Sequence, residues 1–311
     1  MTPNRARPRR RARALVVAGV LAAAAALTGC TSVPAATMTV GTGAPASLSV
    51  VASTDVYGSL ATAVGGDQVA VTSLIDSPTK DPHEFEASAR DQLAVKDADL
   101  VIANGGGYDD FLPQMVEAGG SSPVMVSVAD VSGYPAAGLN EHLWYDVPTM
   151  ERLVDALADR FGDLDPDDAA VFTANATSAK SQLAALASAE EDLAESYRGQ
   201  RFLATEPLAL FMLDAIGLVD ATPPGLQDAV ERGGEIPPDE FLQAIELATG
   251  GTVELVVHDT QTPTAQANAL VENAKNAGTP TVALSETLPK DEDYFTWMKA
   301  NLDLITEALA R

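Results

Sequence analysis

The sequence contains few of the residues on which disulfide-stabilised and nucleic-acid-binding proteins depend. Cys30 is the only cysteine among 311 residues, so no disulfide can form within the chain. Lysine and arginine together number 19, against 44 aspartate and glutamate residues, which gives a formal net charge of −25 at pH 7. A surface of this sign repels phosphate backbones and attracts cations. We therefore expect no nucleic-acid partner and a fold stabilised by its apolar core.

The motifs of common enzymes are also missing from the sequence. It has no His-Glu-x-x-His helix, no Gly-x-Ser-x-Gly elbow and no Walker loop. Gly105, Gly106 and Gly107 follow a predicted strand and could cradle a phosphate, but the spacing of a dinucleotide-binding loop is missing. We interpret them as a tight turn, and we expect no enzymatic activity.

The first thirty residues have the pattern of an export signal. A basic segment with six arginines and no acid precedes the apolar run 15–27, which is shorter than the roughly 20 residues of a membrane-spanning helix. Leu27-Thr28-Gly29-Cys30 resembles the lipobox of bacterial lipoprotein precursors, in which the cysteine receives a lipid. We expect a signal peptide over 1–29 and a flexible, lipidated tether over 30–47.

This interpretation places the folded part on the outer face of the cell membrane, anchored by a lipid on Cys30. Loss of the six signal arginines would change the net charge from −25 to −31. The alternative is an uncleaved anchor helix with an incidental cysteine. The paired arginines leave open whether export follows the general or the twin-arginine route.

Beyond the tether, strand-like and helix-like patterns alternate, which favours parallel sheets flanked by helices. Short apolar runs predict strands at 48–52, 69–75, 100–103, 124–126, 201–205, 255–258 and 281–284. Helical spacing predicts helices at 56–64, 88–96, 109–117, 207–216, 238–248, 264–276 and 294–310.

The middle of the chain differs from this alternation. The segments 148–161 and 166–197 have no strand pattern, and Asp165-Pro166 is typical of a helix start. We predict an α/β fold of two lobes, each a mostly parallel sheet flanked by helices, bridged by one long helix. The boundaries that we expect are 48–147 for the N-terminal lobe, 148–198 for the bridging helical segment and 199–311 for the C-terminal lobe.

Four side chains that could bind a metal ion follow predicted strands. His83 and His142 lie in loops of the N-terminal lobe, while Glu206 and Asp259 follow strands of the C-terminal lobe. Ligand sites of open parallel sheets lie at the carboxyl ends of the strands, and imidazoles with carboxylates form cation sites. Each residue also has a structural explanation. A lone histidine is often only hydrogen-bonded, Glu206 could cap a helix, and Asp259 could be a turn residue.

Residues 48–311 resemble the metal-receptor lipoproteins of zinc and manganese ABC importers. The motifs that carry the resemblance run in order along the chain: Val51-Ala52-Ser53 with Tyr57, Gly65-Gly66-Asp67, Asp81-Pro82-His83, Ala98-Asp99-Leu100-Val101, Asn104-Gly105, His142-Leu143-Trp144 with Asp146, Thr205-Glu206 and Gln261. The His-rich loop of many zinc receptors is absent.

The resemblance implies one metal ion between two lobes bridged by a long helix. Its ligands would be His83, His142 and Glu206, together with an acid in the last metal-binding loop. Only Asp259 is available nearby, and Pro263 stands where some manganese receptors place their aspartate. That departure leaves the fourth ligand open.

The resemblance further implies a receptor that delivers zinc or manganese to a membrane permease powered by a cytoplasmic ATPase. We expect a monomer that binds zinc tightly and manganese more weakly. We also expect Asp146 and Glu84 to accept hydrogen bonds from the ligating imidazoles. The alternatives are a zinc-dependent hydrolase with an open water position, and a surface adhesin with a structural metal. The sequence leaves the physiological metal open.

Overall fold

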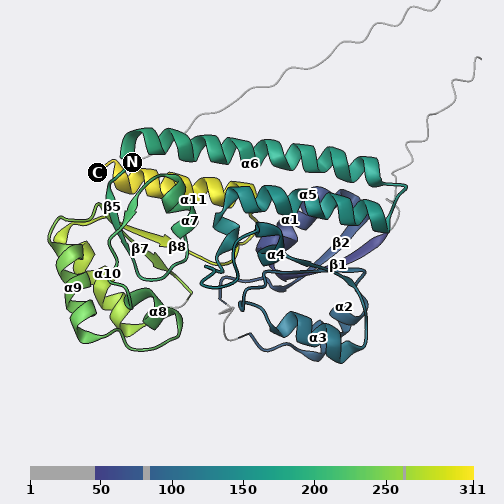
Figure 1. Cartoon of the computed structure of the whole chain (residues 1–311), viewed down its shortest axis with the longest axis horizontal. Helices are drawn as coiled ribbons and strands as arrows, with labels where there is room; N and C mark the ends of the chain where they lie inside the picture. The colour runs from purple at the N-terminus through teal and green to yellow at the C-terminus, as the bar shows by residue number, and fades with distance from the viewer. Residues whose placement is uncertain (1–45, 80–84, 262–263) are drawn as a thin grey trace, which may run out of the picture. The chain divides into compact units, whose positions relative to one another are not determined.

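Two parallel sheets form the framework of the chain, as the computed structural model shows for residues 46–79, 85–261 and 264–311 (Figure 1). The first sheet has the strand order β2-β1-β3-β4. Its strands are β1 (Leu48–Thr54), β2 (Val69–Ile75), β3 (Leu100–Ala103) and β4 (Val124–Ser127). The helical segments of this N-terminal lobe are α1 (Asp55–Gly65), η1 (Gly66–Gln68), α2 (Ala89–Lys96), α3 (Phe111–Gly119), α4 (Val128–Ser132) and η3 (Leu143–Tyr145).

The second sheet repeats this topology, with the order β6-β5-β7-β8. Its strands are β5 (Arg201–Ala204), β6 (Val219–Asp220), β7 (Leu255–Asp259) and β8 (Thr281–Leu284). The helices of this C-terminal lobe are α7 (Leu210–Ala215), α8 (Leu226–Glu231), α9 (Pro238–Thr249), α10 (Ala265–Ala277) and α11 (Tyr294–Leu309). All strand pairings in both sheets are parallel, which confirms the predicted fold class.

One apolar cluster is common to both lobes. Because side chains alternate along a strand, every second residue of β1, β3, β5 and β7 faces this cluster, as Val50 and Ala52 do in β1. The intervening residues face separate clusters. Val51 and Val101 pack with α2 and α3, whereas Leu203 and Val256 pack with α8, α9 and α10. Each sheet is therefore covered on both faces, and one face of each contributes to a core that joins the lobes.

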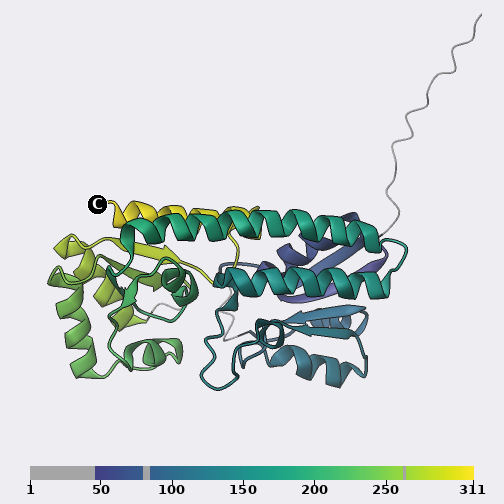
Figure 2. The same ribbon diagram turned by 45° about the horizontal axis from the view of Figure 1, so that its top comes forward.

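The helices α5 (Val147–Leu164) and α6 (Ala169–Tyr197) run along this shared core. Figures 1 and 2 show α6 beside α5 at one end and beside α11 at the other. Its 29 residues correspond to about 44 Å at 1.5 Å per residue. It packs against α1 and α5, and also against α7 and α11. The predicted bridging helix is thus α6, which begins three residues later than Pro166 suggested.

Several short elements were not predicted from the sequence. β6 has two residues, α4 has five and α8 has six, so each is too short for a periodic pattern to repeat several times. The helix predicted at 207–216 is restricted to Leu210–Ala215, because the preceding residues form turns after β5. Within the described ranges, no helix is both long enough and apolar enough to cross a bilayer.

A carboxyl group lies buried on the bridging helix. Glu190 of α6 is 5% exposed, and among the described residues its Oε1 has no hydrogen-bond partner. Burial, together with the nearby Asp146, raises the pKa of Glu190 to about 8. Because the folded chain holds this proton more strongly than the unfolded chain does, its stabilising effect is complete at acidic pH and is lost as the pH rises toward 8.

We expect Glu190→Gln to reduce the pH dependence of stability. In the wild type, this one group should lower the free energy of unfolding by up to about 1.4 kcal/mol for each pH unit between about pH 4.5 and about pH 8. Denaturant unfolding across this interval measures the effect. Glu191→Gln changes the exposed neighbour on the same helix and serves as the control. Identical pH profiles for Glu190→Gln and the wild type would contradict a buried, protonated Glu190.

Candidate metal centre

Three buried carboxylates converge at the carboxyl ends of adjacent strands in the second sheet. Glu206 follows β5, Asp259 ends β7, and Glu286 follows β8. One ligand oxygen from each lies within 4.8 Å of the others, and the three residues are 4%, 5% and 0% exposed. At an effective dielectric constant of about 20, two charges at this separation repel by on the order of 3 kcal/mol. A divalent cation offsets this repulsion, so the cluster has the chemistry of a cation site.

Glu286 was missed in the sequence analysis, which considered Asp259 alone as an acid for the last metal-binding loop. The structure brings Glu206, Asp259 and Glu286 together. The signal for Glu286 was present, because Ser285-Glu286-Thr287 directly follows a predicted strand, as Glu206 and Asp259 do. Asp259 Oδ1 accepts a hydrogen bond from the N–H of Thr260 at 2.6 Å. The candidate ligand set of the C-terminal lobe therefore contains three acids instead of two.

His142 is buried just before η3, and Asn140 fixes its ring. Asn140 Oδ1 accepts hydrogen bonds from His142 N at 3.0 Å and pairs with His142 Nδ1 at 2.8 Å. Asn140 Nδ2 donates to the carbonyl of Pro207 at 2.8 Å, so the amide orientation is determined from both sides. Since an amide oxygen only accepts, Nδ1 carries the proton and Nε2 carries the lone pair that binds metals. The same amide connects the His142 loop to the residue that follows Glu206.

The expectation that Asp146 accepts a hydrogen bond from an imidazole was wrong for His142, whose ring acceptor is Asn140. Asp146 is instead the N-cap of α5. Its Oδ2 accepts from the N–H and the hydroxyl of Thr149, and from the hydroxyl of Tyr134 at 3.3 Å. His83 and Glu84, like Cys30, lie outside the described residues.

The third histidine has a different environment. His258 is half-buried in β7, and its Nδ1 lies 3.3 Å from the backbone oxygen of Asp259. Burial lowers the pKa of His258, so the neutral ring is favoured. His258 is not a member of the group of candidate ligands at the ends of β5, β7 and β8, and we interpret it as a structural residue.

Aromatic residues of the N-terminal lobe surround His142 and reach the carboxylates. The Trp144 ring lies 5.2 Å from that of His142 and 5.3 Å from that of Tyr108. Tyr108 donates from its hydroxyl to Glu286 Oε2 at 2.8 Å. Burial, and then the Glu286 carboxylate, raise the pKa of Tyr108 well above its usual value, so the hydroxyl keeps its proton. Low-polarity walls of this kind exclude water and strengthen electrostatic interactions inside the site.

A glycine turn positions Tyr108. Gly105 has a φ of +74°, and a Cβ at this position would lie 2.7 Å from Ser127 Oγ. Asp109 stabilises the turn, because its carboxylate accepts hydrogen bonds from the N–H groups of Asn104 at 2.6 Å and Gly105 at 2.8 Å. The predicted tight turn at 105–107 therefore has a structural role, which is to direct the next side chain toward the second lobe.

The loop that carries Glu286 is held from both lobes. Gln261 Oε1 accepts the N–H of Glu286 at 2.8 Å and both the N–H and the hydroxyl of Thr287 at 3.1 Å. From the N-terminal lobe, Tyr145 donates from its hydroxyl to the carbonyl of Ser285 at 2.9 Å. Glu286 thus lies on a segment that contacts both halves of the molecule.

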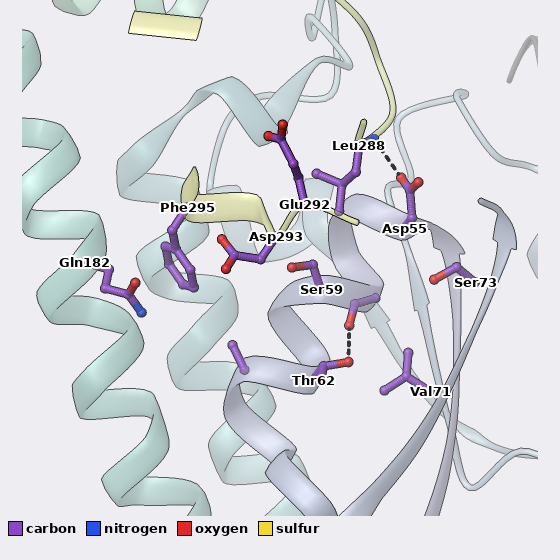
Figure 3. A pocket seen from close by; sticks show the side chains of 12 residues that line it. Asp55, Ser59, Thr62, Val71, Ser73, Gln182, Leu288, Glu292, Asp293 and Phe295 are labelled. Carbon is purple, nitrogen blue, oxygen red and sulfur yellow. Dashed lines mark hydrogen bonds between the residues drawn. The ribbon is translucent and has the colours of Figure 1, made fainter. Parts of the chain in front are cut away.

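The same loop is also held by α1. Figure 3 shows Leu288 donating from its N–H to Asp55 Oδ1, at 3.1 Å, beside a cavity of about 600 Å³. Burial raises the pKa of Asp55 to about 6. Although acidic residues line this cavity, we place the metal centre at Glu206, Asp259 and Glu286, because their ligand atoms are buried and converge.

Comparisons with known proteins agree with this architecture. Manganese-binding lipoprotein MntA of Bacillus subtilis (strain 168) is 28% identical over 319 residues, which cover 94% of this chain and 98% of that protein. The manganese complex of FpvC from Pseudomonas aeruginosa is 21% identical, with a TM-score of 0.69 over 85% of this chain and 98% of that one. The periplasmic zinc-binding protein TroA from Treponema pallidum is 19% identical, with a TM-score of 0.71 over 85% and 99%.

The two solved structures establish that the fold is shared. The family itself follows from a match along the sequence. The model of the family described as zinc-uptake complex component A, periplasmic, matches residues 50–308, which include all but the first two residues of the two sheets, the bridging helices and all three converging carboxylates. The chain therefore belongs to the family of periplasmic component A proteins of zinc-uptake complexes.

Proposed function

We propose that this chain is the extracytoplasmic receptor of an ABC importer, and that it captures one zinc or manganese ion between its lobes. The observation that supports this proposal is the group of three buried carboxylates, Glu206, Asp259 and Glu286. They lie on the side of the second sheet where Tyr108 of the N-terminal lobe donates a hydrogen bond to Glu286. His142 adds an imidazole to these acids. Because its Nδ1 proton is bound by Asn140, its Nε2 is the nitrogen available for metal binding. His83, which lies outside the described residues, is the second imidazole of the proposed site.

Members of this family work with permease and ATPase components of ABC transporters, and delivery to such a permease completes the proposed function. The relatives named above bind manganese or zinc, as their names state. Oxygen ligands favour manganese and nitrogen ligands favour zinc, while zinc binds more tightly at most mixed sites. A ligand set rich in carboxylates therefore reduces the difference in affinity between zinc and manganese. We expect zinc to bind more tightly and manganese to bind as well.

A receptor also needs a route for release. The apolar cluster shared by α5, α6, α11 and both sheets opposes a wide separation of the lobes, because separation would expose this core to water. We propose that release proceeds through movements of the ligand loops and small shifts of the lobes. We propose that the loop of Glu286, which is held by hydrogen bonds from both lobes, is the segment that moves.

Localisation is the second part of the proposal. We propose that the chain is a lipoprotein whose lipid on Cys30 keeps the receptor at the outer face of the cell membrane, close to its permease. The named relative MntA is a lipoprotein by description. The lipobox-like Leu27-Thr28-Gly29-Cys30 supports the same assignment for this chain.

Substitution of the acids distinguishes Glu286 from Asp259 as a ligand. We expect Glu286→Ala to weaken zinc binding by at least about tenfold, because it removes a ligand and a neutralising charge. Asp259→Ala measures the contribution of Asp259, the acid that the sequence suggested for this position. Glu292→Ala, an exposed glutamate in the same loop, is the matched control and should bind like the wild type.

Competition titrations of the four proteins against a common indicator give the affinities for zinc and manganese. If Glu286→Ala binds both metals as the wild type does, Glu286 is not a ligand and the site must be built on the remaining acids. If the wild type binds neither metal, the proposed function fails.

The anchoring assignment predicts that Cys30→Ser blocks lipidation, since the thiol that receives the lipid is lost. The variant should remain as an uncleaved precursor and should no longer incorporate a labelled fatty acid in its bacterial host. Labelling and detergent partitioning measure both effects. A Cys30→Ser protein that matures and partitions into detergent like the wild type would contradict the lipoprotein assignment.

A further inference from the structure

Tyr108 connects the N-terminal lobe to a carboxylate at the edge of the second sheet. Its hydroxyl donates to Glu286 Oε2 at 2.8 Å, and the two residues are 5% and 0% exposed. The glycine turn and Asp109 set its backbone, and contact with the Trp144 ring sets its side chain. The hydrogen bond therefore joins two buried groups, each of which other contacts position.

This contact affects how Glu286 can bind a metal ion. A carboxylate binds a cation either through one oxygen or through both. Chelation through both oxygens would require Oε2 to give up, or to share, a charge-assisted hydrogen bond, which is costly for a buried group. Hydrogen bonds also occupy one polar atom of two other candidate ligands. Asn140 holds His142 Nδ1, and the N–H of Thr260 holds Asp259 Oδ1.

We propose that Tyr108 is a specificity-determining positioning residue, whose hydrogen bond keeps Glu286 a one-oxygen ligand and so keeps the coordination number of the bound ion low. The inference rests on the proposed function, because it concerns the same site. It assigns Tyr108 no direct contact with the metal.

The consequence is a bias between metals. Zinc is commonly four-coordinate and tolerates a small ligand set, whereas manganese favours six ligands in octahedral geometry. Holding Glu286 to one oxygen costs manganese a ligand that it would use and costs zinc little. Tyr108 therefore restores part of the affinity difference in favour of zinc that three carboxylates would otherwise reduce.

The test is Tyr108→Phe, which removes one hydroxyl and leaves the ring in place. The release of Oε2 should allow Glu286 to chelate. We expect zinc affinity to fall by roughly tenfold, as is typical when a ligand loses its hydrogen-bond partner, and manganese affinity to change less. The ratio of the two affinities should shift toward manganese, and X-ray absorption at the metal should show additional oxygen coordination.

Tyr294→Phe is the matched control. It removes a buried hydroxyl that donates to the carbonyl of Trp144 at 2.8 Å, outside the loop of Glu286. It should leave the oxygen coordination and the affinity ratio as in the wild type.

The outcomes separate the inference from the function. Wild-type protein that binds zinc and manganese, together with a Tyr108→Phe variant of unchanged coordination and unchanged affinity ratio, overturns the role of Tyr108 alone. Should Tyr108→Phe fail to fold, a crystal structure of the wild-type zinc complex still decides the question, because Glu286 bound to zinc through both oxygens overturns the inference. Wild-type protein that binds neither ion overturns the proposed function itself.

Discussion

The shared apolar core is the constraint on which the rest of the structure depends. It consists of one face of each sheet and the inner sides of α5, α6 and α11. Both lobes contribute buried residues to one continuous cluster, so the carboxyl ends of the two sheets are held at the same region of the molecule. Loops that follow strands in different lobes can therefore make direct hydrogen bonds, such as the one between Tyr108 and Glu286. Without this core, the candidate ligands would belong to two separately moving bodies.

The shared core places the two lobes, and hydrogen bonds then orient the individual side chains of the candidate site. Asn140 orients His142 and also binds the backbone beside Glu206, while Gln261 binds three groups of the segment Glu286–Thr287. These amides are neutral and add no charge to a site that already contains three acids. Asn140 forms hydrogen bonds through both its amide oxygen and its amide nitrogen, and Gln261 Oε1 accepts three hydrogen bonds. Hydrogen bonds of this kind are what make a buried polar residue stabilising. The site thus separates the residues that supply charge from those that supply orientation.

Periodicity in the sequence predicted the framework well, because strands such as Leu100–Ala103 and helices such as Tyr294–Leu309 carry long or strongly apolar patterns. It could not predict β6, whose two residues are fixed by pairing with β5. The residues of the candidate site were identified from the sequence in part. Glu206 and Asp259 were named from their positions after strands, and Glu286 was not, although it obeys the same rule. The choice of Asn140 over Asp146 as the partner of His142 depends on side-chain geometry that no local pattern encodes.

The aromatic residues give the molecule an optical property. The chain has two tryptophans, and both lie where the two lobes meet. Trp144 is fully buried with its ring against that of His142, and Trp297 of α11 lies 5.8 Å from the ring of Tyr145. Neither is placed to report on the solvent-facing surface. The intrinsic fluorescence of this protein is therefore almost entirely a signal from the interior. A change in the state of the His142 imidazole changes the surroundings of Trp144, which is one of the two indoles that emit.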